Sequence, residues 1–263
     1  MASIDQNAGI HADRRALTAL VVTALLMSCS SHCFAHDFFK ITVVDGQTKR
    51  GVPLVEVRTT NEIRCFTDSS GVVAFHEPGL MDQDVFFSVK SHGYQFPADG
   101  FGTRGKRLRT TPGGSATLEI KRLNIAERLY RVTGGGIYAD SLLTGTPVPT
   151  SQPVLNAKVL GQDTIHCHPY RGKLFWLWGD TNRPSYVFGN FKTTCALSDF
   201  PGINGGLDPS LGVNLHYFAG DDGFAKPMVP LKEEGLVWCD GLFTIADDQG
   251  AERLVAHYVR LKD

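Results

Sequence analysis

Hydrophobic and polar positions alternate along the first half of the chain. In residues 55–58, Val55 and Val57 are separated by charged side chains, so one face of this segment is apolar and the other polar. No long helical pattern accompanies it. Short strands at this spacing predict an all-β fold, a β-sandwich. Other β-rich segments separated by turn residues are 38–44, 72–75, 85–89 and 116–120.

The second half of the chain contains an internal echo. An aspartate in a strand-like segment is followed by a glycine turn, a basic residue, a leucine and an apolar-aromatic run. The two copies cover residues 160–178 and 237–258, and Leu174 and Leu254 place them 80 positions apart. A hairpin repeated in this way, with each sheet packed on the next, is typical of a β-propeller.

Residues 174–178 of the first copy are apolar on both faces. This pattern predicts a strand buried between two neighbouring sheets.

Residues 1–35 have the pattern of a signal peptide for export. Arg14 and Arg15 precede an apolar run over residues 16–27, which is too short to span a bilayer comfortably. We expect cleavage of a signal peptide after Ala35, with no transmembrane span in the mature chain. Two alternatives remain: a lipobox ending at Cys29, which would be lipidated, and a buried N-terminal helix. Export predicts a periplasmic, cell-surface or extracellular location.

The overall charge excludes two classes of partner. Twenty-six Lys and Arg residues balance 27 Asp and Glu residues, giving a formal net charge of -1. This balance provides no basic footprint for nucleic acid or for an anionic membrane.

Residues 51–57 and 67–75 carry a specific resemblance. A strand followed by the turn sequence Thr-Asp-Ser-Ser-Gly at residues 67–71 resembles the transthyretin-like or carboxypeptidase-regulatory-like sandwich family. The resemblance implies a sandwich over residues 36–124, acting as a spacer, adhesive or accessory module. In the turn, we expect Asp68 to bond the backbone and Gly71 to supply a positive φ. The connector, residues 125–153, is predicted to form a glycine turn, a strand and a stiff proline-rich linker.

The motifs Gly-Gln-Asp at 161–163 and Gly-Asp-Thr at 179–181 resemble the opening blade of five-bladed propellers of the glycoside hydrolase family 43 type. The resemblance implies that Asp163 is a general base and Asp240 a second catalytic carboxylate. Inverting hydrolysis needs two carboxyl groups about 6.5–9.5 Å apart, so these two must converge. For Trp178, packing between blades is the favoured interpretation and sugar stacking the alternative. The implied substrate-binding residues are Trp178, Asp180, Thr181, Asn182 and His257.

The length of residues 154–263 limits this propeller. At a period near 80 they hold about one and a half blades, whereas propellers have about four to eight. We therefore expect a partial, truncated propeller that is inactive alone and whose unpaired edges favour self-association. No glutamate matches the position of the family's general acid.

Cysteine and histidine residues are candidates for metal or disulfide sites. Removal of the signal peptide leaves four cysteines, which allow three disulfide connectivities. Their long, irregular spacing favours free or buried thiols, and the absence of a Cys-x-x-Cys pair argues against structural zinc. His166 and His168 lie two residues apart on a predicted strand, where a polar strand edge is the favoured interpretation. We predict no metal and no cofactor. The four cysteines are Cys65, Cys167, Cys195 and Cys239.

Together these patterns predict an exported carbohydrate-active or carbohydrate-binding protein whose partner is a polysaccharide or a cell-surface glycan. Two alternatives stay open: a non-enzymatic binding or scaffolding module, and a metal-binding secreted module. Enzyme activity itself is left undecided, because fold resemblance alone does not establish it.

Overall fold

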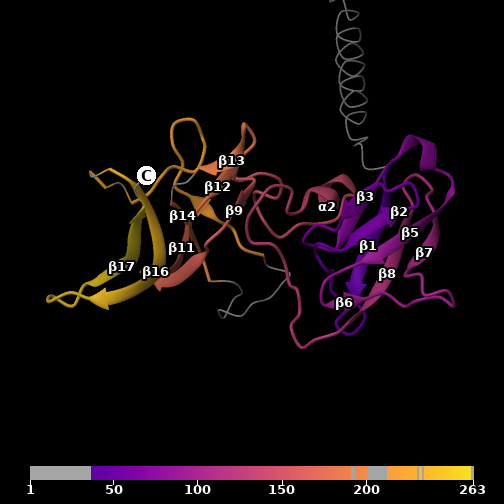
Figure 1. The fold of residues 1–263 in the computed structure, drawn as a ribbon, viewed down its shortest axis with the longest axis horizontal. Helices are drawn as coiled ribbons and strands as arrows, with labels where there is room; N and C mark the ends of the chain where they lie inside the picture. The colour runs from indigo at the N-terminus through magenta and orange to yellow at the C-terminus, as the bar shows by residue number, and fades with distance from the viewer. Residues whose placement is uncertain (1–36, 191–192, 201–211, 230, 233, 262–263) are drawn as a thin grey trace, which may run out of the picture.

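The structure, a computed structural model, describes residues 37–190, 193–200, 212–229, 231–232 and 234–261. These residues form two lobes whose regular secondary structure is almost entirely β-strand (Figure 1). The all-β prediction is confirmed. The predicted signal peptide, its cleavage site after Ala35 and the lipobox Cys29 lie outside the described residues.

The N-terminal lobe contains two four-stranded sheets, with strand orders β4-β1-β8-β6 and β3-β2-β5-β7. Neighbouring strands run antiparallel except for β1 and β8, which are parallel. A short 3-10 turn, Pro78–Leu80, precedes β5. The strands are β1 (Phe39–Asp45), β2 (Glu56–Thr59), β3 (Arg64–Phe66), β4 (Val72–Phe75), β5 (Asp84–Lys90), β6 (Tyr94–Gln95), β7 (Gly105–Arg109) and β8 (Ser115–Arg122).

Both sheets send side chains into one core. Ile41 of β1 and Val57 of β2 are completely buried there. The rings of Phe75 and Phe87, one from each sheet, meet edge to face with centroids 5.0 Å apart. Burying each such side chain contributes about 1.5–3 kcal/mol. The alternation over residues 55–58 is confirmed in β2, where the apolar side chains face this core.

The turn between β3 and β4 forms as its sequence predicts. One carboxylate oxygen of Asp68 accepts the N–H groups of Ser70 at 2.9 Å and Val72 at 3.1 Å. Gly71 has a φ of 75°. A Cβ at this position would lie 2.5 Å from the carbonyl oxygen of Val43, so only glycine fits.

The connector differs from its prediction, because it forms a helix, α2 (Ala139–Leu143), where a strand was expected. Its five residues are too few to show a helical period in the sequence. Contacts with the N-terminal lobe hold it instead: the second carboxylate oxygen of Asp68 accepts the N–H of Ser141 at 2.7 Å. Asp140 accepts a hydrogen bond from the backbone of Ala74. Since β4 is an edge strand, α2 covers an edge that would otherwise be open.

Charged side chains fasten the start of the connector to the same lobe. The guanidinium of Arg128 donates to the carbonyl oxygens of Pro53 and His92, each at 2.7 Å. Glu127 forms a hydrogen-bonded ion pair with Arg50. The hydrogen bond from Arg50 is the main cause that lowers the pKa of the Glu127 carboxyl. The connector is therefore packed along the N-terminal lobe over much of its length.

Asp140 makes this packing sensitive to pH. Burial is the main cause that raises its pKa from 3.8 to about 6, and the negative charge of Asp68 adds to it. The unfolded chain thus loses the proton at lower pH than the folded protein. The stabilising effect of the protonated carboxyl is complete below about pH 4 and is lost as the pH rises through 6. Because the Asp140 carboxyl is partly exposed, we expect its titration to change the free energy of unfolding by about 1–2 kcal/mol.

The substitution Asp140→Asn should remove this pH dependence. Urea unfolding at pH 4 and pH 6.5 is expected to show a smaller difference between the two pH values for the variant, and a variant more stable than the wild type at pH 6.5. An unchanged pH profile would contradict the burial of this carboxyl.

The C-terminal lobe contains three sheets, ordered β10-β11-β14-β15, β13-β12-β9 and β16-β17. All pairs are antiparallel. The strands are β9 (Gly161–Gln162), β10 (His166–Tyr170), β11 (Lys173–Trp178), β12 (Thr181–Arg183), β13 (Tyr186–Asn190), β14 (Thr194–Ser198), β15 (His216–Tyr217), β16 (Leu236–Ala246) and β17 (Glu252–Leu261).

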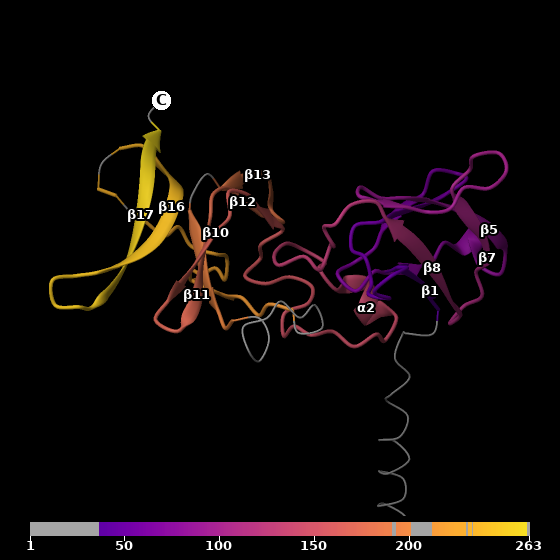
Figure 2. The same ribbon diagram turned by 90° about the horizontal axis from the view of Figure 1, so that it is seen from below.

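Strand β11 is buried on both faces, as its sequence predicts. Trp176 and Trp178 pack toward Val132 of the connector. On the opposite face, Leu177 packs against the β16–β17 hairpin at Leu242. Figure 2 shows the hairpin beside the sheet that contains β10 and β11.

The internal echo does not correspond to a structural repeat. In the second copy, its two segments pair with each other in the β16–β17 hairpin. In the first copy, β9 pairs with β12, while β11 pairs with β10 and β14. Similar sequences therefore occupy different positions, because pairing depends on partners outside the echoed segments. Within the described ranges, the sheets do not close into a barrel or a ring of blades.

Across the part of the chain that the structure describes, no helix has the length and apolar character needed to cross a membrane.

Candidate functional site

Asp163 and Asp180 meet where two turns touch. One carboxylate oxygen of Asp163 accepts the N–H of Asp180 at 2.9 Å. The backbones are also joined, since the N–H of Asp163 donates to the carbonyl oxygen of Asp180 at 3.1 Å. The Gly-Gln-Asp and Gly-Asp-Thr motifs, 16 or more residues apart in the sequence, thus form one local unit.

The two carboxyl groups have different environments. Burial raises the pKa of the Asp180 carboxyl, and the negative charge of Asp163 raises it further. One Asp180 oxygen is buried without a hydrogen-bond partner in the described structure. Asp163 is exposed and accepts a backbone hydrogen bond.

Asp240 lies elsewhere, on the β16–β17 hairpin. The ladder shifts register between Cys239 and Gly241, so Asp240 is the extra residue of a β-bulge. Its carboxylate is hydrogen-bonded to Nδ1 of His257 on the facing strand. Both side chains are well exposed, at 47% for Asp240 and 70% for His257.

No hydrogen bond or ion pair between described residues joins Asp163 with Asp240. Asp163 is bonded to the Asp180 turn, and Asp240 to His257. Their sequence contexts look alike, but one follows a two-residue strand and the other sits in the middle of an 11-residue strand. The resemblance carried by the echo therefore gives no common geometry to the two aspartates.

Trp178 and Thr181 belong to the core of the C-terminal lobe. Both are 0% exposed. The Trp178 ring is stacked on Trp176 at 6.0 Å and contacts Tyr217 at 5.4 Å between centroids. Neither side chain offers a surface for a ligand, which corrects their placement among the substrate-binding residues and agrees with the packing interpretation of Trp178.

Gln162 organises a polar network that sequence reasoning missed. Its side-chain oxygen accepts hydrogen bonds from Thr133 at 2.6 Å and from the hydroxyl of Tyr217 at 2.7 Å. Its amide nitrogen donates to Thr194 at 2.8 Å, and Thr194 is bonded to Thr181. The network joins the connector to four strands, β9, β12, β14 and β15. Burial raises the pKa of Tyr217 to about 12. The Gly-Gln-Asp motif contained this residue, but the resemblance drew attention to the aspartate.

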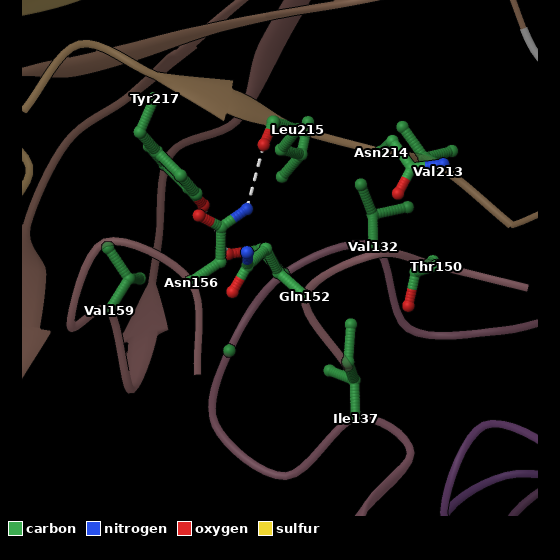
Figure 3. Close-up of a pocket in the computed structure, with 12 residues that line it drawn as sticks. Val132, Ile137, Thr150, Gln152, Asn156, Val159, Val213, Asn214, Leu215 and Tyr217 are labelled. Atoms are coloured by element: carbon green, nitrogen blue, oxygen red, sulfur yellow. Dashed lines mark hydrogen bonds between the residues drawn. The ribbon is translucent and has the colours of Figure 1, made fainter. Parts of the chain in front are cut away.

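A small cavity lies beside this network (Figure 3). Its volume is about 20 Å³, room for about one water molecule and far too little for a sugar. Thr150 on its wall has a buried hydroxyl without a partner among the described residues, which suits an ordered water. Across the cavity, Asn156 donates to the carbonyl oxygen of Leu215 at 2.7 Å.

A larger open groove runs along the β12–β13 turn. Its volume is about 460 Å³, within the range of small-molecule sites. Asn182 lies on its wall, as does Tyr186, whose side chain is 56% exposed. Arg183 places its guanidinium over the ring of Phe224 at 5.4 Å, which fixes the arginine in position. The residues around the groove are Leu160, Asn182, Arg183, Pro184, Ser185 and Tyr186.

The two candidate metal ligands, His166 and His168, have different surroundings. His168 is hydrogen-bonded to Thr244 at 3.2 Å, and one ring nitrogen of His166 is buried without a partner. Among the described residues, no three His, Cys, Asp or Glu side chains gather as a metal site would require.

In comparisons with known proteins, no protein family model and no curated protein matches the chain. The groove and the residues around it are therefore the basis for assigning a function.

Proposed function

We propose that this chain is an exported glycan-binding protein, in which a transthyretin-like sandwich accompanies part of a propeller of the glycoside hydrolase family 43 type. The observation that carries the proposal is the open groove beside Asn182 and Tyr186. Export is supported by the signal-like sequence of residues 14–35.

The groove has the chemistry that sugar recognition uses. An exposed tyrosine ring such as Tyr186 presents an apolar face to the C–H groups of a pyranose and a hydroxyl to its oxygens. Asn182 adds both a donor and an acceptor for neighbouring sugar hydroxyls. Arg183 adds a planar cation for hydroxyl or carboxylate oxygens. A volume of about 460 Å³ holds one or two sugar rings.

Two structural features support the propeller-like part of the proposal. The meander β10-β11-β14-β15 has four antiparallel strands, the size of one propeller blade. The β12–β13 hairpin, which bears the groove, is inserted between its second and third strands. The apolar β16–β17 hairpin packs on one face of this sheet, as a neighbouring blade does.

Binding is favoured over hydrolysis by the positions of the carboxylates. Hydrolysis by an inverting mechanism requires two opposed carboxyl groups around one bond, whereas Asp163 and Asp240 have separate partners. Asp180 and Asp163 adjoin Asn182 along the chain and the turn, so in this proposal they shape the end of the groove.

Glycan binding is testable with Tyr186→Ala. A screen against an array of neutral and acidic oligosaccharides identifies a ligand, and isothermal titration then measures its affinity. Loss of one aromatic stacking contact is expected to weaken binding about tenfold. Tyr258→Ala is the matched control, because Tyr258 is also exposed but lies on β17. Equal loss in both variants, or no glycan bound by the wild type, contradicts the proposal.

Scaffolding is the second candidate function. The outer face of the β16–β17 hairpin exposes a row of apolar side chains, and this favours self-association with a second copy. A protein that binds no glycan but forms dimers in sedimentation experiments would support scaffolding instead. The exposed side chains are Leu236, Phe243, Ile245, Val259 and Leu261.

A further inference from the structure

Two of the four described cysteines lie in one buried cluster. Cys195 of β14 and Cys239 of β16 are 2% and 3% exposed, and both pack with Leu177. Cys65 belongs to β3 in the other lobe, and Cys167 is exposed on β10. In the structure all four are free thiols.

A hydrogen bond near the two buried cysteines joins the segment before β14 to strand β16. The hydroxyl of Thr193 donates to the carbonyl oxygen of Val237 at 3.3 Å. Cys195 and Cys239 each follow this contact by two residues, so their side chains return to the same faces of their strands. Burial raises the pKa of the Cys239 thiol, and the Thr193 side chain lowers it, so these two side chains lie near each other. The hairpin and the four-stranded sheet are thus aligned at this point.

We propose that Cys195 and Cys239 form a disulfide bond that fastens the β16–β17 hairpin to the four-stranded sheet. Of the three ways to pair four cysteines, only one contains this pair. Its second bridge would join Cys65 to Cys167 in separate lobes, so the proposal leaves those two as thiols. The inference rests on the export that the proposed function includes, because disulfides persist in oxidising compartments.

The reaction is an oxidation by thiol–disulfide exchange. The two thiols lose two protons and two electrons as the sulfur–sulfur bond forms. The electrons reduce a disulfide of a small thiol compound or of a thiol oxidase to two thiols. A mixed disulfide between one cysteine and the oxidant is the intermediate, and the second cysteine displaces it.

Burial determines when the bond forms. It raises the pKa of the Cys195 thiol to about 12, so little of the attacking thiolate exists in the folded protein near neutral pH. The oxidant also has poor access to two side chains in a core. The bond therefore forms during folding, before the hairpin closes over the sheet, and a protein folded in reducing conditions oxidises slowly.

Refolding distinguishes these cases. Full-length protein is unfolded, reduced and refolded either in a buffer of reduced and oxidised glutathione or in dithiothreitol. Free thiols are then alkylated in denaturant and the tryptic peptides are mapped by mass spectrometry. We expect a cross-linked peptide pair containing Cys195 and Cys239 only after oxidative refolding, with Cys65 and Cys167 alkylated in both samples. The oxidised sample should melt about 5–10 °C higher, because a disulfide constrains the unfolded chain.

Single substitutions provide the controls. Cys195→Ala and Cys239→Ala should each abolish the difference in melting temperature between the two samples, while Cys65→Ala and Cys167→Ala should preserve it. Complete alkylation of both buried cysteines after oxidative refolding, or a bridge to Cys65 or Cys167, overturns the pairing.

Two further measurements separate this inference from the proposed function. If the bond forms in the test tube but the protein recovered from cells contains only thiols, export is wrong and the pairing geometry stands. Glycan binding measured on both refolded samples tests the groove independently of the disulfide.

Discussion

Replacing Asp68 with alanine is expected to lower the free energy of unfolding of the N-terminal lobe by about 3–5 kcal/mol. The carboxylate is nearly buried and accepts three backbone N–H groups, from Ser70, Val72 and Ser141. Alanine leaves all three donors without their acceptor. Two of them define the turn before β4, and the third holds α2 against the rest of the lobe.

Asp68→Asn separates these two roles. The amide oxygen can replace the carboxylate oxygen that serves Ser70 and Val72, but the NH₂ group would then face the N–H of Ser141, where two donors oppose each other. We expect a loss between that of alanine and that of the wild type, with the turn kept and α2 released. Hydrogen exchange of the backbone around residues 69–72 and 139–143 distinguishes the two effects.

Unfolding of this lobe is measured by circular dichroism. Tryptophan fluorescence serves as an internal reference, because all three tryptophans lie in the C-terminal half, between Trp176 and Trp238. If Asp68→Ala costs less than about 1 kcal/mol, water replaces the carboxylate and the turn does not depend on it.

The second large effect is expected for Trp178→Ala. This side chain is completely buried between Trp176 and Tyr217. Its removal leaves a cavity in the core of the C-terminal lobe, and large aromatic-to-alanine changes cost about 3–5 kcal/mol. We therefore expect partial unfolding of that lobe at ordinary temperature, seen as a lowered urea midpoint in the fluorescence of the remaining tryptophans.

Trp178→Phe is the conservative control. Phenylalanine keeps most of the aromatic volume and removes an indole N–H that is buried without a partner in the described structure. Its cost should be well below that of alanine. If Trp178→Ala weakened glycan binding while leaving the urea midpoint unchanged, the side chain would act in recognition and its packing role would be wrong.

The sequence predicts those parts of the fold that are determined by residues close together along the chain. The alternation over residues 55–58 predicts the inner and outer faces of β2, and the Asp68 and Gly71 turn forms as expected. Strand β11 is buried on both faces because its own residues are apolar on both. These features need no information about distant contacts.

The elements that escaped prediction depend on partners far along the chain. Strands β3 and β6 contain three and two residues, too few for a periodic signal, and are defined by the strands that they pair with. Helix α2 is fixed by Asp68, 73 positions away from Ser141. Sequence alone predicts a strand in this part of the connector, because tertiary hydrogen bonds leave no local pattern.

The candidate site was predictable only in part. The motifs pointed to residues 161–163 and 179–182, and these do lie together, with Asn182 on the groove. The pairing of Asp163 with Asp240 came from the echo, which reflects similar composition without similar strand pairing. Tyr186 was missed because one aromatic residue after a Pro-Ser turn has no distinguishing context until the hairpin folds.

The packing of α2 against the edge strand β4 determines where the N-terminal lobe can be cut for transfer to another protein. A cassette cut after Arg122 would lose the Ser141 N–H that donates to Asp68 and would expose an edge strand ready to pair with a foreign one. A portable version of the N-terminal lobe, grafted onto another host protein, must include the chain through Leu143.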